Sequence, residues 1–310
     1  MADIATRQAY GEALVELGKK HHFYVLSADL AESVKVDLFK KAFPERYIEC
    51  GIAEANMMGM AAGIASTGVP AVASSYAMFT AGRGYEQIRN SIAYPNLHVV
   101  IGASHSGVSV GEDGATHQCC EDIALMRVVP GMTVISPCDA IEAAQATEAA
   151  LLEAKGPVYL RLSRPGTPAV NKEGYKFELG KGVVLADGKD VTIVATGLMV
   201  ARALAARELL LAKGIDAAVI NIHTIKPIDS ALLSEYAKKT GNIVTVEEHS
   251  VIGGLGSAVT EAICENAPCP VTRVGINDTF GISGPSNEVL AHFGLTAEGI
   301  ADKVEKALAK

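Results

Sequence analysis

The sequence lacks the features by which secreted, membrane-bound and nucleic-acid-binding proteins are recognised. Its six cysteines form no Cys-x-x-Cys pair and are spread over 310 residues, which favours reduced thiols over disulfides or a zinc site. No block of lysine and arginine occurs, and with a net charge of −8 a surface for nucleic acid or an anionic membrane would oppose the overall field. No basic, apolar leader opens the chain, and no charge-free segment is long enough to span a membrane. We therefore expect a cytoplasmic protein that binds neither nucleic acid nor membrane.

Length and composition favour an α/β protein with two domains. A chain of 310 residues exceeds the size at which one hydrophobic core stops growing. From residue 4 to about residue 162, short runs rich in β-branched residues alternate with longer helical patterns, which is the βαβ pattern of a mainly parallel sheet. We predict strands at 23–27, 70–73, 97–102, 133–136 and 158–162, and helices at 6–19, 53–66 and 140–153.

Residues 166–189 interrupt this alternation with prolines, glycines and charges, which indicates a linker that carries a small hairpin. A second α/β series follows the linker. We therefore place one domain at 1–165 and a second at 190–310, each with a mainly parallel sheet. For the second domain we predict strands at 191–195, 217–221, 243–247 and 271–274, and helices at 199–213, 230–239, 254–265 and 297–309.

Polar residues directly after strands are the candidate site residues, because ligands bind at the carboxyl ends of strands in open parallel sheets. Glu54 stands in the first turn of the 53–66 helix, whose other residues are mostly small and apolar. One interpretation is a partner for the positive end of the helix dipole. The other is a buried carboxyl group that exchanges a proton at neutral pH.

Two further clusters follow predicted strands. The loop at 104–118 contains His105, Asp113 and His117 and is too polar to be explained as core. If residues 113–117 form a helical turn, Asp113 and His117 share one face. Arg164 lies just beyond the strand at 158–162, where its guanidinium offers paired donors for phosphate or carboxylate. A salt bridge at the domain boundary would explain Arg164 equally well.

In this order, the three clusters resemble the pyrimidine-binding domain of transketolases, and the second half of the chain is similar to their C-terminal domain. The motif GIAE at 51–54 resembles the family motif whose glutamate hydrogen-bonds the aminopyrimidine of thiamine diphosphate. The resemblance implies this catalytic, cofactor-binding role for Glu54. The segment YAMFTAG at 76–82 resembles the aromatic surface beneath the pyrimidine, with Tyr76 and Phe79 in the stacking positions. Alternatively, Tyr76 and Phe79 are aromatic residues of a helix in the hydrophobic core and contact no cofactor.

The resemblance also implies a set of substrate-binding residues. The segment GEDGATHQ at 111–118 is similar to the family's substrate loop, in which an aspartate and a histidine hold sugar hydroxyls. These roles fall on Asp113 and on His117, for which a catalytic role is also implied. The residues that resemble the family's site for the terminal sugar phosphate are Arg7, Ser33, His105 and Arg164.

One family motif is missing from the sequence. Transketolases bind magnesium and the diphosphate of the coenzyme with a Gly-Asp-Gly motif, and this chain contains none. Because the resemblance begins at Ile4, we expect the diphosphate-binding domain on another polypeptide. The implied protein is one subunit of a split transketolase of the pentose phosphate pathway, active as an α2β2 assembly on sugar phosphates. Thiamine diphosphate and Mg²⁺, or another divalent cation, would be shared with the Gly-Asp-Gly partner, and no metal ligand is assigned to this chain.

Three alternatives stay open. The Glu54 motif also occurs in deoxyxylulose-phosphate synthase and in the beta chains of 2-oxoacid dehydrogenases. The combination of His105, Asp113, His117 and Arg164 favours transketolase, because the synthase pattern lacks a histidine at the first position. A phosphate-binding site with His105 and Arg164 also argues against the dehydrogenase, because its substrate, an acid of pyruvate's size, carries no phosphate. A non-catalytic protein on the same fold is the third alternative, and the retention of every polar site residue argues against it.

Overall fold

The computed structural model describes residues 3–309 of the chain. The first half forms most of a seven-stranded sheet with the strand order β12-β6-β7-β5-β4-β2-β3. Neighbouring strands run parallel, except that β12 comes from the second half and pairs antiparallel with β6. Strands β4 and β5 are buried at every residue, as expected for parallel strands covered on both faces. The strands are β2 (Tyr24–Ser27), β3 (Tyr47–Glu49), β4 (Ala71–Tyr76), β5 (Val99–Ser104), β6 (Thr133–Ile135), β7 (Val158–Arg161) and β12 (Thr224–Lys226).

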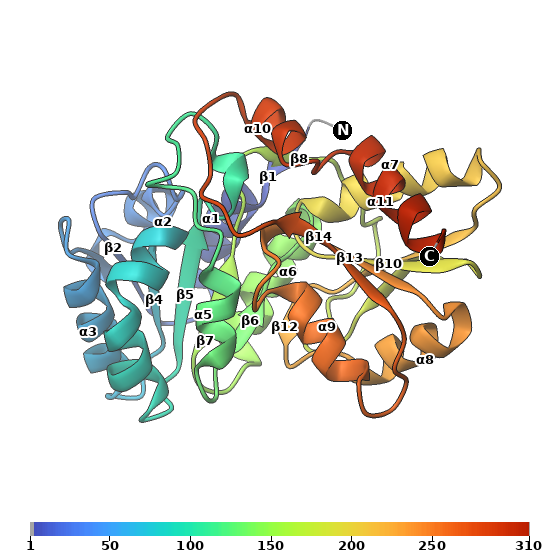
Figure 1. Ribbon diagram of the computed structural model, residues 1–310. Helices are drawn as coiled ribbons and strands as arrows, with labels where there is room; N and C mark the ends of the chain where they lie inside the picture. The colour runs from blue at the N-terminus through green and yellow to red at the C-terminus, as the bar shows by residue number, and fades with distance from the viewer. Residues whose placement is uncertain (1–2, 310) are drawn as a thin grey trace.

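Alternating side chains send this sheet into two different cores. Val72 points into a cluster with α1, α2 and α6, whereas its neighbours Ala71 and Ala73 point into a cluster with α3, the π-helical segments and α5. Helices therefore cover both faces of the sheet (Figure 1). These elements are α1 (Thr6–Gly18), α2 (Asp37–Ala42), α3 (Glu54–Ala65), α4 (Tyr85–Gln87), α5 (Asp122–Val128) and α6 (Ala140–Leu152), with π-helical turns at Phe79–Arg83 and Ile88–Ala93.

The second half forms a five-stranded sheet with the order β14-β13-β10-β11-β9, parallel except for the pair β11 and β9. Helices α7 and α11 pack on one face of this sheet, and α8 and α9 pack on the other. Its elements are β9 (Val183–Ala186), β10 (Val191–Ala195), β11 (Ala217–Asn221), β13 (Ile243–Ser250), β14 (Val271–Ile276), α7 (Met199–Leu211), α8 (Ser230–Thr240), α9 (Leu255–Ile263), α10 (Ser286–His292) and α11 (Ala297–Leu308).

The predicted fold class, two successive α/β units with mainly parallel sheets, is confirmed. The predicted hairpin within 166–189 is wrong, because the strands of this segment join different sheets. Strand β8 (Gly166–Thr167) pairs with β1 (Ile4–Ala5), while β9 pairs with β11. Between these strands, the carboxylate of Asp139 accepts hydrogen bonds from the backbone N–H groups of Val170 and Asn171. The segment is thus fixed to the body of the protein along its length, and the domain limits stay a prediction.

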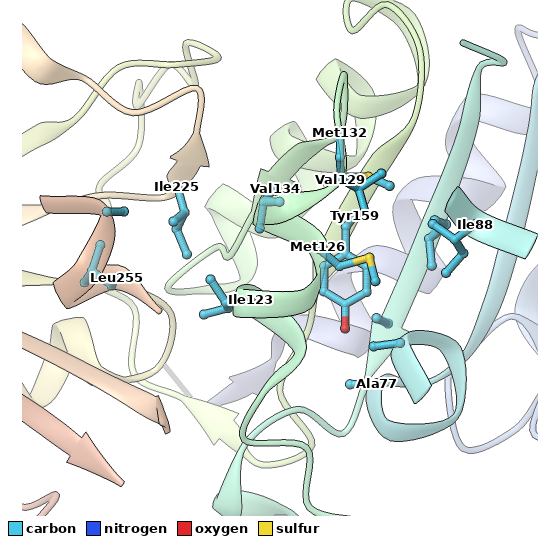
Figure 2. Close-up of a cluster of buried hydrophobic side chains, with 14 of the residues drawn as sticks. Ala77, Ile88, Ile123, Met126, Val129, Met132, Val134, Tyr159, Ile225 and Leu255 are labelled. Carbon is cyan, nitrogen blue, oxygen red and sulfur yellow. The ribbon is translucent and has the colours of Figure 1, made fainter. Parts of the chain in front are cut away.

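The two halves share a buried junction. Ile225 and Leu255 of the second half belong to the same hydrophobic cluster as Ile123 of α5 (Figure 2). Beside this cluster, Arg161 Nε donates to the carboxylate of Asp122 at 2.8 Å, with both side chains almost fully buried. Arg161 also donates to the backbone carbonyl of Glu248, on β13, at 3.1 Å. The halves therefore pack as one unit. None of the helices within residues 3–309 combines the length and hydrophobicity needed to cross a membrane.

Candidate active site

A column of planar side chains crosses the carboxyl end of the first sheet. The residues that end β4 and β5, Tyr76 and Ser104, are paired in register, so the rings of Tyr76 and His105 meet. Their ring centroids lie 3.8 Å apart at 16°. Phe79 opens the π-helical turn after β4 and stacks on Tyr76 with centroids 5.6 Å apart at 10°. The guanidinium of Arg83 lies 4.3 Å from the centroid of Phe79 and completes the column.

Glu54 lies at the Arg83 end of this column. It is the first residue of α3 and is 3% exposed, so its carboxyl group is both buried and at the positive end of the helix dipole. Proton exchange by Glu54 stays a prediction. Arg83 Nη1 lies 3.4 Å from Glu54 Oε1. The sequence interpretation missed Arg83, although its spacing of four residues from Phe79 is the one that brings side chains together on a helix.

The other end of the column holds the four residues assigned to a sugar phosphate. The Arg7 guanidinium, presented by α1, reaches the other three. It donates to the backbone carbonyls of Arg164, at 3.2 Å, and of Ser33, at 2.5 Å, and its Nη1 lies 3.4 Å from His105 Nε2. Burial, and then the positive charges of Arg7 and Arg164, lower the pKa of His105 to about 3. His105 is therefore neutral at pH 7, and its Nε2 accepts from Arg7 while Nδ1 donates to Ser104 Oγ.

Arg164 lies partly exposed beside this group. Its Nη1 donates to the carbonyl of Val110 at 2.6 Å and to Glu112 Oε2 at 2.8 Å, so the salt bridge that we considered is present. Burial and the neighbouring charge of Arg164 lower the pKa of Arg7, which shows that the two cations repel each other. The exposed carboxylate of Glu112 pairs with Arg164, whereas Arg7 forms no ion pair with a carboxylate among residues 3–309. This region can therefore take up a further anion.

The loop with the predicted sugar-binding residues is not helical. Gly114 has φ = +74°, a left-handed conformation that breaks a helical turn across 113–117. The condition under which Asp113 and His117 would share a helical face is therefore not met. His117 is half-buried and lies edge-on to Phe79, with centroids 5.3 Å apart. Asp113 is exposed, and no side-chain hydrogen bond within residues 3–309 involves it. The structure thus brings His117 to the edge of Phe79, while the exposed Asp113 side chain forms no hydrogen bond with a residue of the column.

A cavity of about 610 Å³ opens beside the Arg83 end of the column. The first half contributes Phe79, Arg83 and Gln118 to its wall, and the second half contributes the loop after β14, including Phe280. Phe280 is 84% exposed at this position. The sequence interpretation assigned no site residue to the second half, because nothing in the 278–285 segment resembles a chemical motif.

Comparisons with known proteins match both halves of the chain to one family. Residues 2–169 match the family model of the transketolase pyrimidine-binding domain, and residues 180–300 match that of the transketolase C-terminal domain. A putative transketolase C-terminal section from Methanocaldococcus jannaschii is 49% identical over 308 residues, covering 98% of this chain and 96% of that protein. A 6-deoxy-6-sulfo-D-fructose transketolase subunit from Clostridium sp. is 43% identical over 295 residues, covering 95% and 91%.

A solved structure described as a split gene transketolase, an inactive beta4 tetramer, superimposes with a TM-score of 0.92. It is 52% identical in sequence, and the match covers 99% of both chains. The expected resemblance is therefore confirmed along nearly the whole chain. This protein belongs to the transketolase family and combines the family's pyrimidine-binding domain with its C-terminal domain.

Proposed function

We propose that this chain is one subunit of a thiamine-diphosphate-dependent transketolase that transfers a two-carbon ketol unit between phosphorylated sugars. The observation that carries the proposal is the column described above. It places a buried carboxylate and an aromatic face at one end, and paired arginines at the other. Such an arrangement suits an extended pair of ligands, a planar heterocycle followed by a sugar with a terminal anion.

The residues at the Glu54 end fit the pyrimidine of the coenzyme. Arg83 places a planar group with N–H donors 4.3 Å from the Phe79 centroid, with Nη1 3.4 Å from Glu54 Oε1. An aminopyrimidine is also planar and also donates N–H hydrogen bonds, so the same carboxylate and ring suit it. In the proposed enzyme, the diphosphate and Mg²⁺ are held mainly by a second, Gly-Asp-Gly subunit in an α2β2 assembly. The similarity to a transketolase C-terminal section and to a transketolase subunit supports this division.

The coenzyme, when bound, supplies the stabilisation of a carbanion. The chain's own residues then have distinct tasks. Glu54 holds and transfers the proton at the pyrimidine ring nitrogen, and Tyr76 and Phe79 provide the stacking surface. His117 and Asp113 bind and orient sugar hydroxyls, His117 from its place beside Phe79.

The terminal phosphate of the sugar binds at the opposite end of the column. Because His105 is neutral and accepts from Arg7, the charge that binds the phosphate comes from Arg7 and Arg164, while Ser33 helps to fix Arg7. The Clostridium relative is named for a sugar that carries a sulfonate in place of a terminal hydroxyl. A sulfonate is also a tetrahedral anion, which supports recognition of a terminal anion at this end.

Reconstitution tests this function. The chain is mixed with a Gly-Asp-Gly transketolase subunit, Mg²⁺ and thiamine diphosphate, and ketol transfer is followed together with the mass by sedimentation. We expect the mixture to be active and the chain alone to be inactive. Glu54→Gln should lower turnover by about 10²–10⁴-fold without changing the assembly, whereas Glu45→Gln, on an exposed side chain, should not. Robust turnover by the chain alone, or near-normal turnover of Glu54→Gln, would overturn the proposal.

A further inference from the structure

The loop that carries Asp113 and His117 packs directly on the second half of the protein. We call residues 111–118 the substrate loop and residues 278–285, between β14 and α10, the C-terminal loop; Figure 1 shows the two segments running past each other. Gly111 has φ = +84°, and a Cβ at this position would lie 3.2 Å from the carbonyl oxygen of Gly284. Ser283 Oγ donates to the carbonyl of Glu112 at 2.6 Å. The backbones of the two loops are therefore in contact.

Gln118 is the main polar link between these loops. Its side chain is 3% exposed. Its Nε2 lies 3.2 Å from the carbonyl oxygen of Val108, 3.1 Å from that of Gly111 and 2.8 Å from that of Ile282. An amide nitrogen carries two hydrogens, so the three carbonyls share them, with the shortest contact to the C-terminal loop. The side-chain amide thus joins the turn that leads into the substrate loop, at the carbonyls of Val108 and Gly111, to the second half.

The other side of the Gln118 amide is in close contact with the C-terminal loop. A Cβ built at Gly281 would lie 1.7 Å from Gln118 Oε1, so only glycine fits there while Gln118 keeps its place. The second half also contacts the chain just before the substrate loop. Glu248 Oε2, on β13, accepts from the backbone N–H of Ser109 at 3.1 Å. The position of the substrate loop therefore depends on side chains and backbone of the second half.

We propose that Gln118 is a positioning residue that lets the C-terminal loop set the geometry of Asp113 and His117. This inference rests on the proposed function, in which those two residues bind sugar hydroxyls. Asp113 has no side-chain hydrogen bond of its own within residues 3–309, so its place is set by the backbone on either side of it. The second half thus contributes to substrate binding indirectly, because Gln118 positions the substrate loop and does not itself contact the sugar.

Three variants separate this role from a general contribution to stability. Gln118→Ala removes the amide, and Gly281→Ala displaces it from the opposite loop. Gln145→Ala is the matched control, because Gln145 also joins distant segments through its amide. Its Nε2 donates to the carbonyl of Tyr175 at 2.9 Å, and its Oε1 accepts from the N–H of Phe177 at 2.7 Å.

The first measurement is amide hydrogen exchange on the chain without a partner. The N–H groups of Gly114 and His117 donate to the carbonyls of Gly111 and Gly114 within the substrate loop. We expect both amides to exchange about tenfold faster or more in Gln118→Ala and Gly281→Ala, and at the wild-type rate in Gln145→Ala. Unchanged exchange in the first two variants would overturn the inference, whatever the enzyme's activity.

The second measurement uses the reconstituted enzyme. Gln118→Ala should raise KM for the sugar substrates about tenfold or more and leave kcat within about threefold. In the Asp113→Ala background it should add little, since it acts through that residue. Fully additive effects, or a kinetic profile equal to that of Gln145→Ala, would show a merely structural role and overturn the inference. Failure of the wild-type mixture to transfer ketol units would refute the proposed function, and the exchange result would still decide the coupling of the loops.

Discussion

Replacing Arg83 with alanine is expected to strengthen coenzyme binding by the reconstituted enzyme. The Arg83 guanidinium lies 4.3 Å from the Phe79 centroid, and its Nη1 lies 3.4 Å from Glu54 Oε1. These are the groups to which we assign the pyrimidine ring. One place cannot hold two planar groups, so the coenzyme has to displace the guanidinium. Alanine at this position removes the competitor.

The size of the effect follows from the two contacts that are lost. The Arg83 side chain is 57% exposed, and an ion pair with one exposed partner is worth about 0.2–1 kcal/mol. A cation above an aromatic ring at an exposed position adds about 0.5–1 kcal/mol. The competing contacts therefore amount to about 0.7–2 kcal/mol, and their removal should lower the Kd of thiamine diphosphate about 3–30-fold.

Calorimetric titration of the reconstituted pair with thiamine diphosphate, at saturating Mg²⁺, measures this change. Arg89→Ala is the matched control, because Arg89 belongs to the next π-helical turn, is exposed and, within residues 3–309, hydrogen-bonds through its side chain only to Asn90. Its Kd should stay within about twofold of the wild-type value. A Kd for Arg83→Ala that is unchanged or higher would refute the reasoning, since Arg83 would then stay in place or contribute to binding.

Other predictions concern the anion site and the junction of the halves. Arg164→Ala should raise KM for phosphorylated sugars about 10–100-fold and change KM for unphosphorylated analogues much less; equal changes would favour the dehydrogenase alternative. Arg161→Met leaves the buried carboxylate of Asp122 without its ion-pair partner and should lower the free energy of unfolding by about 3–5 kcal/mol in urea titrations. Adding Asp122→Asn to this variant removes the buried charge and should make the loss smaller. Lys306→Met, at an exposed pair, should cost less than about 0.5 kcal/mol. Burial raises the pKa of Glu248 from 4.5 to about 7. Between these two pH values the folded chain keeps a proton that the unfolded chain releases, so the free energy of unfolding falls as the pH rises from 4.5 to about 7. Relative to wild type, Glu248→Gln should therefore gain about 1–3 kcal/mol between pH 5 and pH 8, and a constant difference would contradict the assignment.

The buried strands were the most predictable part of the fold. The apolar runs at 191–195 and 217–221 coincide with β10 and β11, because a strand covered on both faces needs a continuous apolar sequence. Strands β3 and β12 are three residues long and lie at the edges of the sheet. They are too short to produce a recognisable apolar run in the sequence. The hairpin prediction failed because pairing partners of β8 and β9 lie far away in the sequence.

The candidate site shows the same division. Arg7, Ser33, His105 and Arg164 were assigned from local motifs, and the structure places them around one guanidinium. Gln118 stands within a quoted motif, yet its contact with Ile282 spans 164 residues of sequence. No local pattern reports such a contact. Residues for which we propose contact with a ligand thus stand in local motifs, while residues that hold them through tertiary contacts do not.

The crossing of β12 into the first sheet has a consequence for dividing the gene. A polypeptide cut within 166–189 would leave β6 as an open edge, with unpaired N–H and C=O groups along it. The N-terminal fragment would also expose its own apolar surface, including Ile123, which packs against Ile225 and Leu255 in the whole chain. Each half would need the other during its own synthesis, and separate expression would favour aggregation over folding. The segment that reads as a linker is therefore a poor place for a chain break, an intein or an inserted domain.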